Sequence, residues 1–303
     1  MVDPAGIYLI DKPAGITSNG CLSIIKRKLG IKKAGHSGTL DPMATGLMVV
    51  AIGRYTRLLT DIITDTKSYS GTFSIGFETN TLDIEGEVVR RVEAAVDPRL
   101  IESAAEAFLG ESDQLPPKVS AIKVQGKRAY DLERSNVEFE LATRRVVVSD
   151  FTISYRPELD CFGFDLACSS GTYVRSLVRD VAYSCATLGT LLQLRRTKIG
   201  SFDVEEAVAP EAVTADLKIS MSRALSSFQR IFVSKDIADD LFMGRRIPAG
   251  DLTALVSPSD DRIAVFLEPE AAGASLDGHD PPLVGFVRML DGWLKPESMF
   301  PLA

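Results

Sequence analysis

Apolar residues in the first 60 positions form short continuous runs separated by one stretch with helical spacing. Ile7–Ile10 is a run of four apolar residues that Lys12-Pro13 soon follows, which predicts a short buried strand. Between the polar cap Thr17-Ser18-Asn19 and Gly30, apolar residues recur at helical spacing, which predicts a helix. Leu47–Ile52 is again continuous and predicts a second buried strand.

The chain from there to residue 200 mixes strand-like and helix-like segments without a regular strand–helix–strand rhythm. The pattern predicts strands over Tyr69–Phe77, 144–155, 162–168 and 190–198, helices over 54–63, 97–109 and 173–186, and a polar connection over 78–86. This order is typical of an α+β domain with a mixed, largely antiparallel sheet and flanking helices.

The character of the chain changes near residue 230. Beyond it the sequence is acidic, rich in Pro and Gly, and built of short apolar runs at Leu252–Val256, Ile263–Leu267 and Leu283–Met289. Such runs separated by turns predict a small β-rich C-terminal domain. We therefore expect one domain over 1–230 and a second over 231–303.

Composition fits a soluble globular protein, with 45% hydrophobic and 25% charged residues among 303. No apolar run reaches the roughly 20 residues of a membrane helix, and the first residues lack the basic leader of a signal peptide. The four cysteines are scattered and only two histidines are present, which makes a Cys/His zinc site hard to assemble. We expect free thiols in a cytoplasmic protein without a metal.

The formal net charge of −7 is unevenly distributed. Residues 231–303 contain twelve acids and six Lys or Arg, a net of −6, which leaves −1 for residues 1–230. Three acid-free basic clusters lie at 21–40, 114–130 and 195–198. Such clusters can contact the phosphates of a nucleic acid, and they can also be solvated helix faces and turns.

The stretch GHSGTLDPMATG, residues 35–46, places reactive residue types in turn-forming surroundings. Asp41 precedes Pro42, which disfavours helical backbone, while the glycines allow sharp bends. A carboxylate held in this way can be a nucleophile, a base or a plain turn residue. The segment has no second acid to suggest magnesium and no glycine pattern of a phosphate-binding loop. Its spacing does not decide among these roles.

The same stretch closely resembles the catalytic loop of the bacterial TruB family, pseudouridine synthases that act on the T arm of tRNA. Further segments resemble family motifs in the same order, namely Ile7–Ser18, Lys67-Ser-Tyr69, Gln114–Arg134, Cys168–Leu177 and Leu191–Gly200. The resemblance covers about residues 5–200. It implies the pseudouridine synthase fold and isomerisation of uridine to pseudouridine at the T-loop position numbered 55, without a cofactor or metal.

The resemblance also implies roles for individual residues. Asp41 is the catalytic carboxylate, which either attacks the anomeric carbon of the ribose or removes a ribose proton. Tyr69 stacks on the base, Leu194 lines the pocket, and Arg175 pairs with Asp41. Tyr173 assists proton movement at carbon 5 or packs beside the base. From the residues alone, the two tyrosines fit core aromatics and Arg175 fits a surface charge, so these roles depend on the resemblance.

Other implied roles concern RNA binding and support of the pocket. His36 wedges into the RNA loop while the target base is flipped out of its stack. Lys12 and Pro13 support the floor of the pocket. An RNA-binding insertion is expected at about 78–140, and 231–303 resembles a PUA-type domain. The residues expected to contact the RNA backbone are Lys26, Lys32, Lys33, Lys123, Lys127 and Arg128. The family often has Lys where this chain has Ser170, which removes one phosphate contact.

Two rival functions differ in what they require. Guide-RNA-dependent pseudouridine synthases related to dyskerin share a similar Asp loop, but the 114–134 motif and the lack of long basic tails favour a stand-alone enzyme. A non-catalytic RNA chaperone would not require Asp41, Tyr69 and Arg175 together. We therefore expect a monomer that binds the T arm of tRNA without a guide RNA and without a membrane.

Overall fold

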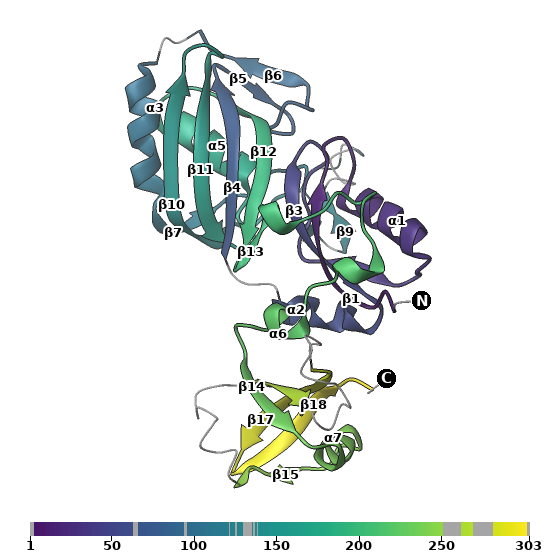
Figure 1. Ribbon diagram of the computed structural model, residues 1–303. Helices are drawn as coiled ribbons and strands as arrows, with labels where there is room; N and C mark the ends of the chain where they lie inside the picture. The colour runs from purple at the N-terminus through teal and green to yellow at the C-terminus, as the bar shows by residue number, and fades with distance from the viewer. Residues whose placement is uncertain are drawn as a thin grey trace.

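The computed structural model describes residues 3–62, 66–93, 96–120, 122–124, 126–129, 135, 137, 139–250, 262–268 and 281–301. Figure 1 shows a large sheet with flanking helices and, below it, a smaller second sheet near the C-terminus. A small group of short helical segments lies between the two.

The first elements follow the sequence prediction closely. β1 (Gly6–Lys12) is the expected buried strand, and α1 (Ser18–Leu29) is the expected helix. The hydroxyl of Thr17 caps α1 by accepting a hydrogen bond from the backbone N–H of Gly20. Gly30 ends it with φ 65°, a left-handed conformation that glycine adopts without strain. β3 (Thr45–Ile52) pairs antiparallel with β1.

A mixed, largely antiparallel sheet of nine strands forms the centre of the described chain, as expected. Its order is β1-β3-β12-β4-β11-β10-β7, with β2 added to β3 and β13 added to β12. Neighbours along this path are antiparallel except β3 and β12, which run parallel. The remaining strands of this sheet are β2 (Ala34–His36), β4 (Thr66–Ile75), β7 (Gly110–Gln114), β10 (Arg144–Arg156), β11 (Cys161–Ser169), β12 (Gly189–Ile199) and β13 (Phe202–Asp203).

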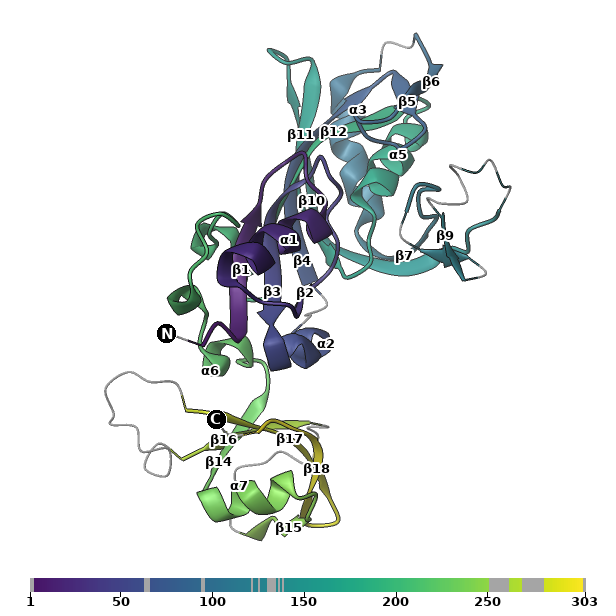
Figure 2. The same ribbon diagram turned by 90° about the vertical axis from the view of Figure 1, so that its right-hand side faces the viewer.

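Helix α5 (Val174–Ser184) packs on this sheet and, together with α3 (Pro98–Ala104), contributes to its main hydrophobic core. Figure 2 shows both helices on the same side of β10 and β11. The segment predicted as a helix over 97–109 continues past α3 as a 3-10 helix, and that over 54–63 is a 3-10 helix followed by a short α-helix. These and the other short elements are η1 (Gly53–Leu58), α2 (Leu59–Ile62), η2 (Ala105–Phe108), η3 (Val204–Glu206), η4 (Ala215–Leu217), α6 (Met221–Ala224), β5 (Phe77–Thr79), β6 (Val88–Arg91), β8 (Lys123–Val124) and β9 (Lys127–Arg128).

The C-terminal region is strand-rich, as expected, and also contains a helix that the sequence analysis missed. Its five-stranded sheet has the order β14-β16-β17-β18-β15 within the described residues. The elements are β14 (Gln229–Val233), α7 (Lys235–Phe242), β15 (Ile247–Pro248), β16 (Ile263–Leu267), β17 (Leu283–Leu290) and β18 (Trp293–Met299). Helix α7 places Ala238 and Leu241 in the core of this sheet. The expected strand at Leu252–Val256 lies outside the described residues, and the boundary at 230 stays a prediction.

The two sheets are joined by one continuous apolar cluster. It includes Ile7 of β1, Ile62 of α2, Met221 of α6 and Phe286 of β17. Because these side chains are removed from water together, the second sheet is packed onto the first body rather than tethered to it. Among the described residues, no helix is both long and apolar enough to cross a membrane.

Candidate active site

The loop that carries Asp41 connects β2 to β3, and the side chain of Lys12 holds it through hydrogen bonds. The fully buried ammonium of Lys12 donates to the carbonyl oxygens of Pro13 (2.8 Å), Ile16 (2.8 Å) and Pro42 (3.2 Å). Burial lowers the pKa of Lys12. These contacts fit the supporting role expected for Lys12, because the ammonium ties the loop at the residue after Asp41.

A second clamp holds the residue before Asp41. The hydroxyl of Ser18, at the start of α1, donates to the carbonyl of Leu40 over 3.1 Å and accepts from the N–H of Leu40 over 2.9 Å. Asp41 is therefore presented from a backbone that is fixed on both sides. Such fixation is what a carboxylate needs if it is to meet a substrate in one orientation.

The predicted ion pair between Asp41 and Arg175 is present. Nε of Arg175 lies 3.0 Å from Oδ2 of Asp41, and Nη2 donates to Oδ1 over 3.2 Å. The Arg175 side chain is 5% exposed and comes from the first turn of α5, whereas the Asp41 side chain is 34% exposed. Enclosure of the carboxylate raises the pKa of Asp41, and the charge of Arg175 opposes this rise.

Arg175 also binds a second carboxylate, Asp83, which the sequence analysis did not single out. Nη1 of Arg175 lies 3.4 Å from Oδ2 of Asp83, and both side chains are 5% exposed. Asp83 lies in the segment interpreted as a polar connection, but its Oδ1 accepts hydrogen bonds from Thr81 Oγ1 (2.7 Å) and the N–H of Glu85 (3.1 Å). The segment ETNTLDIEG contains three acids, Glu78, Asp83 and Glu85, and no local signal distinguishes Asp83 from the other two.

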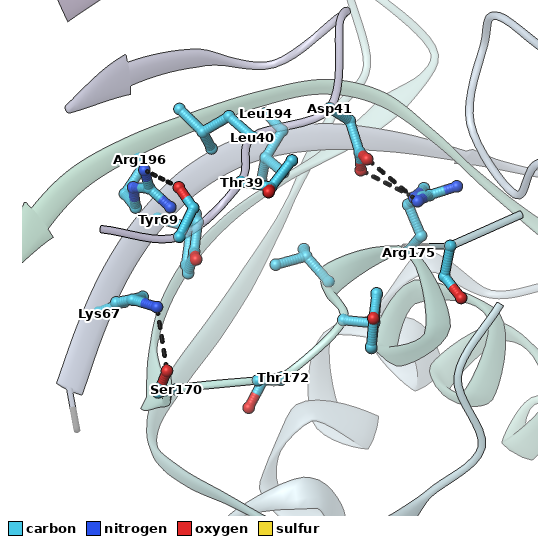
Figure 3. A pocket seen from close by; sticks show the side chains of 15 residues that line it. Thr39, Leu40, Asp41, Lys67, Tyr69, Ser170, Thr172, Arg175, Leu194 and Arg196 are labelled. Atoms are coloured by element: carbon cyan, nitrogen blue, oxygen red, sulfur yellow. Dashed lines mark hydrogen bonds and ion pairs between the residues drawn. The ribbon is translucent and has the colours of Figure 1, made fainter. Parts of the chain in front are cut away.

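A pocket of ≈ 290 Å³ opens beside the Asp41–Arg175 pair. Tyr69 of β4 and Leu194 of β12, on neighbouring strands, are 8% and 7% exposed and form part of its wall. Tyr173, at the N-cap of α5, also lines it and is held by Gln114, which accepts from the N–H of Tyr173 over 2.8 Å. Figure 3 shows the labelled side chains around this space. The structure thus brings together five residues that the sequence analysis placed at one site: Asp41, Tyr69, Tyr173, Arg175 and Leu194.

The charged residues of the third basic cluster, at 195–198, are paired within the protein. Arg195 forms a two-point ion pair with Asp11 (3.0 and 2.8 Å), and Lys198 lies 3.4 Å from Asp203. Arg196 is 1% exposed. Three charged residues in four positions looked like a surface patch, but alternation along β12 turns Arg196 inward.

Arg196 instead forms part of the pocket wall. Its Nε donates to the carbonyl of Leu47 over 2.7 Å, and Nη2 donates to the carbonyl of Gly38 over 3.3 Å. Its guanidinium also hydrogen-bonds the phenol of Tyr69, as Figure 3 shows. Burial raises the pKa of Tyr69 in spite of this contact. Arg196 therefore fixes the Tyr69 ring and the Asp41 loop at once.

His36 lies on the other side of Asp41, in a second cavity of ≈ 490 Å³. Asp41, Asp83 and Arg175 also line this cavity, so it adjoins the first. Nδ1 of His36 is buried and has no hydrogen-bond partner among the described residues. Burial lowers the pKa of His36, which favours a neutral imidazole. This position fits the expected wedge, and that role stays a prediction.

The expected contacts to the RNA backbone are only partly described. Lys32 and Lys33 are exposed, and Lys26 is half-buried in the last turn of α1. Lys123, Lys127 and Arg128 lie on β8 and β9, and their side chains are outside the described residues. In the described part of the chain, no group of three or more His, Cys, Asp or Glu side chains could hold a metal ion.

Comparison with known proteins identifies the family. Residues 26–174 match the model of the TruB family pseudouridylate synthase, N-terminal domain. The tRNA pseudouridine synthase B of Leifsonia xyli subsp. xyli (strain CTCB07) is 41% identical over 278 residues, covering 86% of this chain and 92% of that protein. That of Arthrobacter sp. (strain FB24) is 38% identical over 304 residues, covering 98% and 96%.

Solved structures agree on the fold. A crystal structure of a Cbf5–Nop10–Gar1 complex matches with a TM-score of 0.65 at 20% identity, covering 94% of this chain and 78% of that one. At this identity the likeness concerns the fold alone. The family model and the matched relatives lead to one conclusion: the chain belongs to the TruB family of pseudouridylate synthases.

Proposed function

We propose that this enzyme converts the uridine at position 55 in the T loop of tRNA to pseudouridine, with Asp41 as the catalytic carboxylate. The observation that carries the proposal is the two-point pairing of Asp41 with buried Arg175 at the edge of the Tyr69 pocket. The matched relatives named tRNA pseudouridine synthase B support tRNA as the substrate.

The geometry supports a mechanism in which the target nucleoside leaves its stack. A uridine inside a folded RNA loop must be flipped out before its sugar can reach Asp41. Asp41 then attacks the anomeric carbon or removes a ribose proton, and the bond from C1′ to N1 breaks with its electron pair on the base. The uracil turns and C5 bonds to C1′. This step releases the Asp41 carboxylate from C1′ on the first route, and on the second route the ribose proton is returned from Asp41. C5 then gives up its proton and N1 gains one. Product and substrate are isomers, so no oxidant or co-reactant is consumed.

The pocket wall suits a base that must be retained and turned. Tyr69 offers a flat aromatic face and Leu194 an apolar one, and both are held by neighbouring strands. Arg175 keeps the carboxylate of Asp41 directed while the sugar changes its bonding partner. Rigid walls beside a fixed carboxylate are the arrangement expected for a reaction in which only the base moves.

The RNA is expected to be recognised by the protein alone. His36 in the second cavity and the basic clusters at 21–40 and 114–130 are proposed to contact the T arm, which would make binding sensitive to salt. Residues 231–303 are proposed to act as a PUA-like RNA-binding domain, and the insertion at about 78–140 is proposed to bind RNA as well. We propose a monomeric cytoplasmic enzyme that needs no guide RNA.

The test is to incubate the purified chain with an unmodified tRNA transcript and map pseudouridine along it. We expect one modified position, in the T loop, and the same product in an isolated T-arm hairpin. Asp41→Asn is expected to abolish product while leaving hairpin binding nearly intact, since it removes a carboxylate but keeps the side-chain volume. Modification elsewhere, a requirement for a guide RNA, or full turnover by Asp41→Asn would contradict the proposal.

A further inference from the structure

A buried lysine lies across the Tyr69 pocket from Asp41. Lys67 and Tyr69 are two residues apart on β4, so both side chains point to the same face of the sheet. Lys67 is 6% exposed and lines the pocket, and its Nζ donates to Oγ of Ser170 over 3.1 Å. Figure 3 shows Lys67 and Ser170 on one side of the pocket and Asp41 with Arg175 on the other.

Gly38 brings the Asp41 loop against this ammonium. Its φ is +88°, and a Cβ at this position would lie 3.2 Å from Nζ of Lys67 and 3.9 Å from Nη1 of Arg196. The loop therefore passes two buried cations at a residue that has no side chain. Both cations are fixed by neighbouring groups, because Ser170 holds the first, and the carbonyls of Leu47 and Gly38 hold the second.

The orientation of the nucleoside follows from this arrangement. The ribose must meet Asp41, so the base extends from there along the wall made by Tyr69 and Leu194. Lys67 lies on the side of that wall away from Asp41. Because Lys67 lines the pocket on that side, its ammonium is placed to meet the base.

We infer that the ammonium of Lys67 donates a hydrogen bond to a carbonyl oxygen of the uracil and stabilises the charge that the base acquires as it leaves the sugar. The inference rests on the proposed function, because it assigns uracil as the leaving group. When the bond from C1′ to N1 breaks, its electron pair is delocalised from N1 onto O2 and O4. A fixed cation in a water-poor pocket stabilises that charge more in the transition state than in the bound uridine. Lys67 is thereby a catalytic residue, and Ser170 positions it.

The experiment measures single-turnover rates on T-arm hairpins that carry uridine, 2-thiouridine or 4-thiouridine at the target position. Lys67→Met keeps the length of the side chain and removes its charge, and we expect the rate on uridine to fall about 10²–10³-fold with unchanged hairpin affinity. Ser170→Ala keeps the ammonium but removes its partner, and we expect a smaller loss of about tenfold. Lys218→Met, at an exposed lysine that follows η4 and lies outside every proposed RNA-binding segment, is the matched control and is expected to leave the rate unchanged.

The sulfur substitutions separate a contact with the base from a structural effect. Sulfur accepts hydrogen bonds weakly, so replacing the contacted oxygen is expected to slow the parent enzyme and to leave Lys67→Met unaffected. The inference would be overturned if Lys67→Met reacted at the parent rate, or if its rate fell only as far as its hairpin affinity. It would also be overturned if sulfur at each of the two positions slowed Lys67→Met by the same factor as it slows the parent enzyme. An inactive parent would overturn the proposed function and this inference with it, whereas an active parent with an active Lys67→Met variant overturns the inference alone.

Discussion

Arg175 binds the buried carboxylate of Asp83 through Nη1, while its Nε and Nη2 bind Asp41. One guanidinium therefore holds two carboxylates, of which Asp41 is 34% exposed and Asp83 only 5%. The carbonyl oxygens of Thr81 and Val119 accept two further hydrogen bonds from Arg175. A planar guanidinium bound on so many sides has little freedom to rotate. Asp83 thus fixes the arginine that pairs with Asp41, the proposed catalytic carboxylate, and does not line the Tyr69 pocket itself.

Asp83→Asn is expected to lower both stability and rate. It removes one of the two negative charges beside a buried guanidinium and weakens its hydrogen bonds, which should reduce the free energy of unfolding by about 1–3 kcal/mol. A small displacement of Arg175 then shifts the carboxylate of Asp41 relative to the bound nucleoside, and we expect the single-turnover rate to fall by up to about 100-fold. Urea unfolding and single-turnover assays measure the two effects. Asp97→Asn is the control, because Asp97 caps α3 at an exposed site and Asn is an equally good cap. Parent-like values for Asp83→Asn would refute this positioning role.

The enzyme should lose activity in acid at a higher pH than it would if Asp41 had the pKa of an ordinary aspartate. Enclosure raises the pKa of Asp41 above its usual value, and the proposed mechanism needs the ionised form, so we expect the rate to fall as the pH drops through this raised pKa. Arg175 holds the pKa of Asp41 down, so Arg175→Met should move the acid limb of the pH–rate profile to higher pH. The residual activity of Arg175→Met, measured from pH 4 to pH 8, tests this. An acid limb at unchanged or lower pH would contradict it.

The raised pKa of Asp41 affects stability in the opposite direction to activity: as the pH rises, activity increases but stability decreases. Because the folded protein binds the Asp41 proton more tightly than the unfolded chain does, Asp41 contributes stability below the unfolded pKa and loses it as the pH rises through the folded pKa. At neutral pH the ionised carboxylate therefore opposes folding. Asp41→Asn should then be at least as stable as the parent at pH 7. Between the unfolded and the folded pKa of Asp41, its free energy of unfolding should depend less on pH than that of the parent. A clear loss of stability at pH 7 would show that the ion pair outweighs desolvation.

The sequence predicted those parts of the fold that are determined locally. The strand at β1, the helix between Thr17 and Gly30, and the strand at β3 follow from apolar spacing and capping residues, which act within a few positions. Helix α7 was missed because its apolar positions lie in an acidic segment that resembles a polar connection. In the same way, the strand β7, GESDQ, contains no apolar residue and forms only by pairing with β10.

The site was predicted from motif resemblance. The site residues that the resemblance did not indicate owe their positions to contacts between segments far apart in the sequence. In the sequence, Asp83 and Arg196 look like surface charges. Nothing within a few positions of Asp83 indicates that a distant arginine binds it, and nothing near Arg196 indicates that its side chain points into the pocket. Lys67 was quoted as part of a motif, but its burial follows from the central place of β4 between β11 and β12. Charge in a sequence does not report burial when the compensating group is far along the chain.

Gly46 is required where the Asp41 loop enters the sheet. Its φ is +106°, and a Cβ would lie 2.2 Å from the carbonyl oxygen of Arg196, at the parallel junction of β3 and β12. Gly46→Ala should therefore lower the free energy of unfolding by more than about 3 kcal/mol, because it combines backbone strain with overpacking. Gly110→Ala is the matched control: its φ is likewise positive, at +90°, but nothing lies within 4 Å of the added Cβ, so only about 1–2 kcal/mol of conformational strain is expected. Equal losses for the two variants, measured by urea unfolding, would disprove the steric argument.

The apolar cluster that joins the two sheets predicts that they unfold together. Phe286 of β17 is fully buried in the same cluster as Ile62 of α2 and Met221 of α6, so Phe286→Ala should destabilise the whole chain by about 3–5 kcal/mol. Calorimetry should show one transition that moves as a unit to lower temperature. Trp293→Ala is the control, since this aromatic residue on the neighbouring β18 is 45% exposed and outside the cluster. Two separate transitions, of which only one moves, would mean that the second sheet is an independent unit. One transition would mean that removing residues 231–303 exposes a surface that is buried in the full chain. The proposed RNA-binding role of that region then has to be tested by substitutions in the full chain.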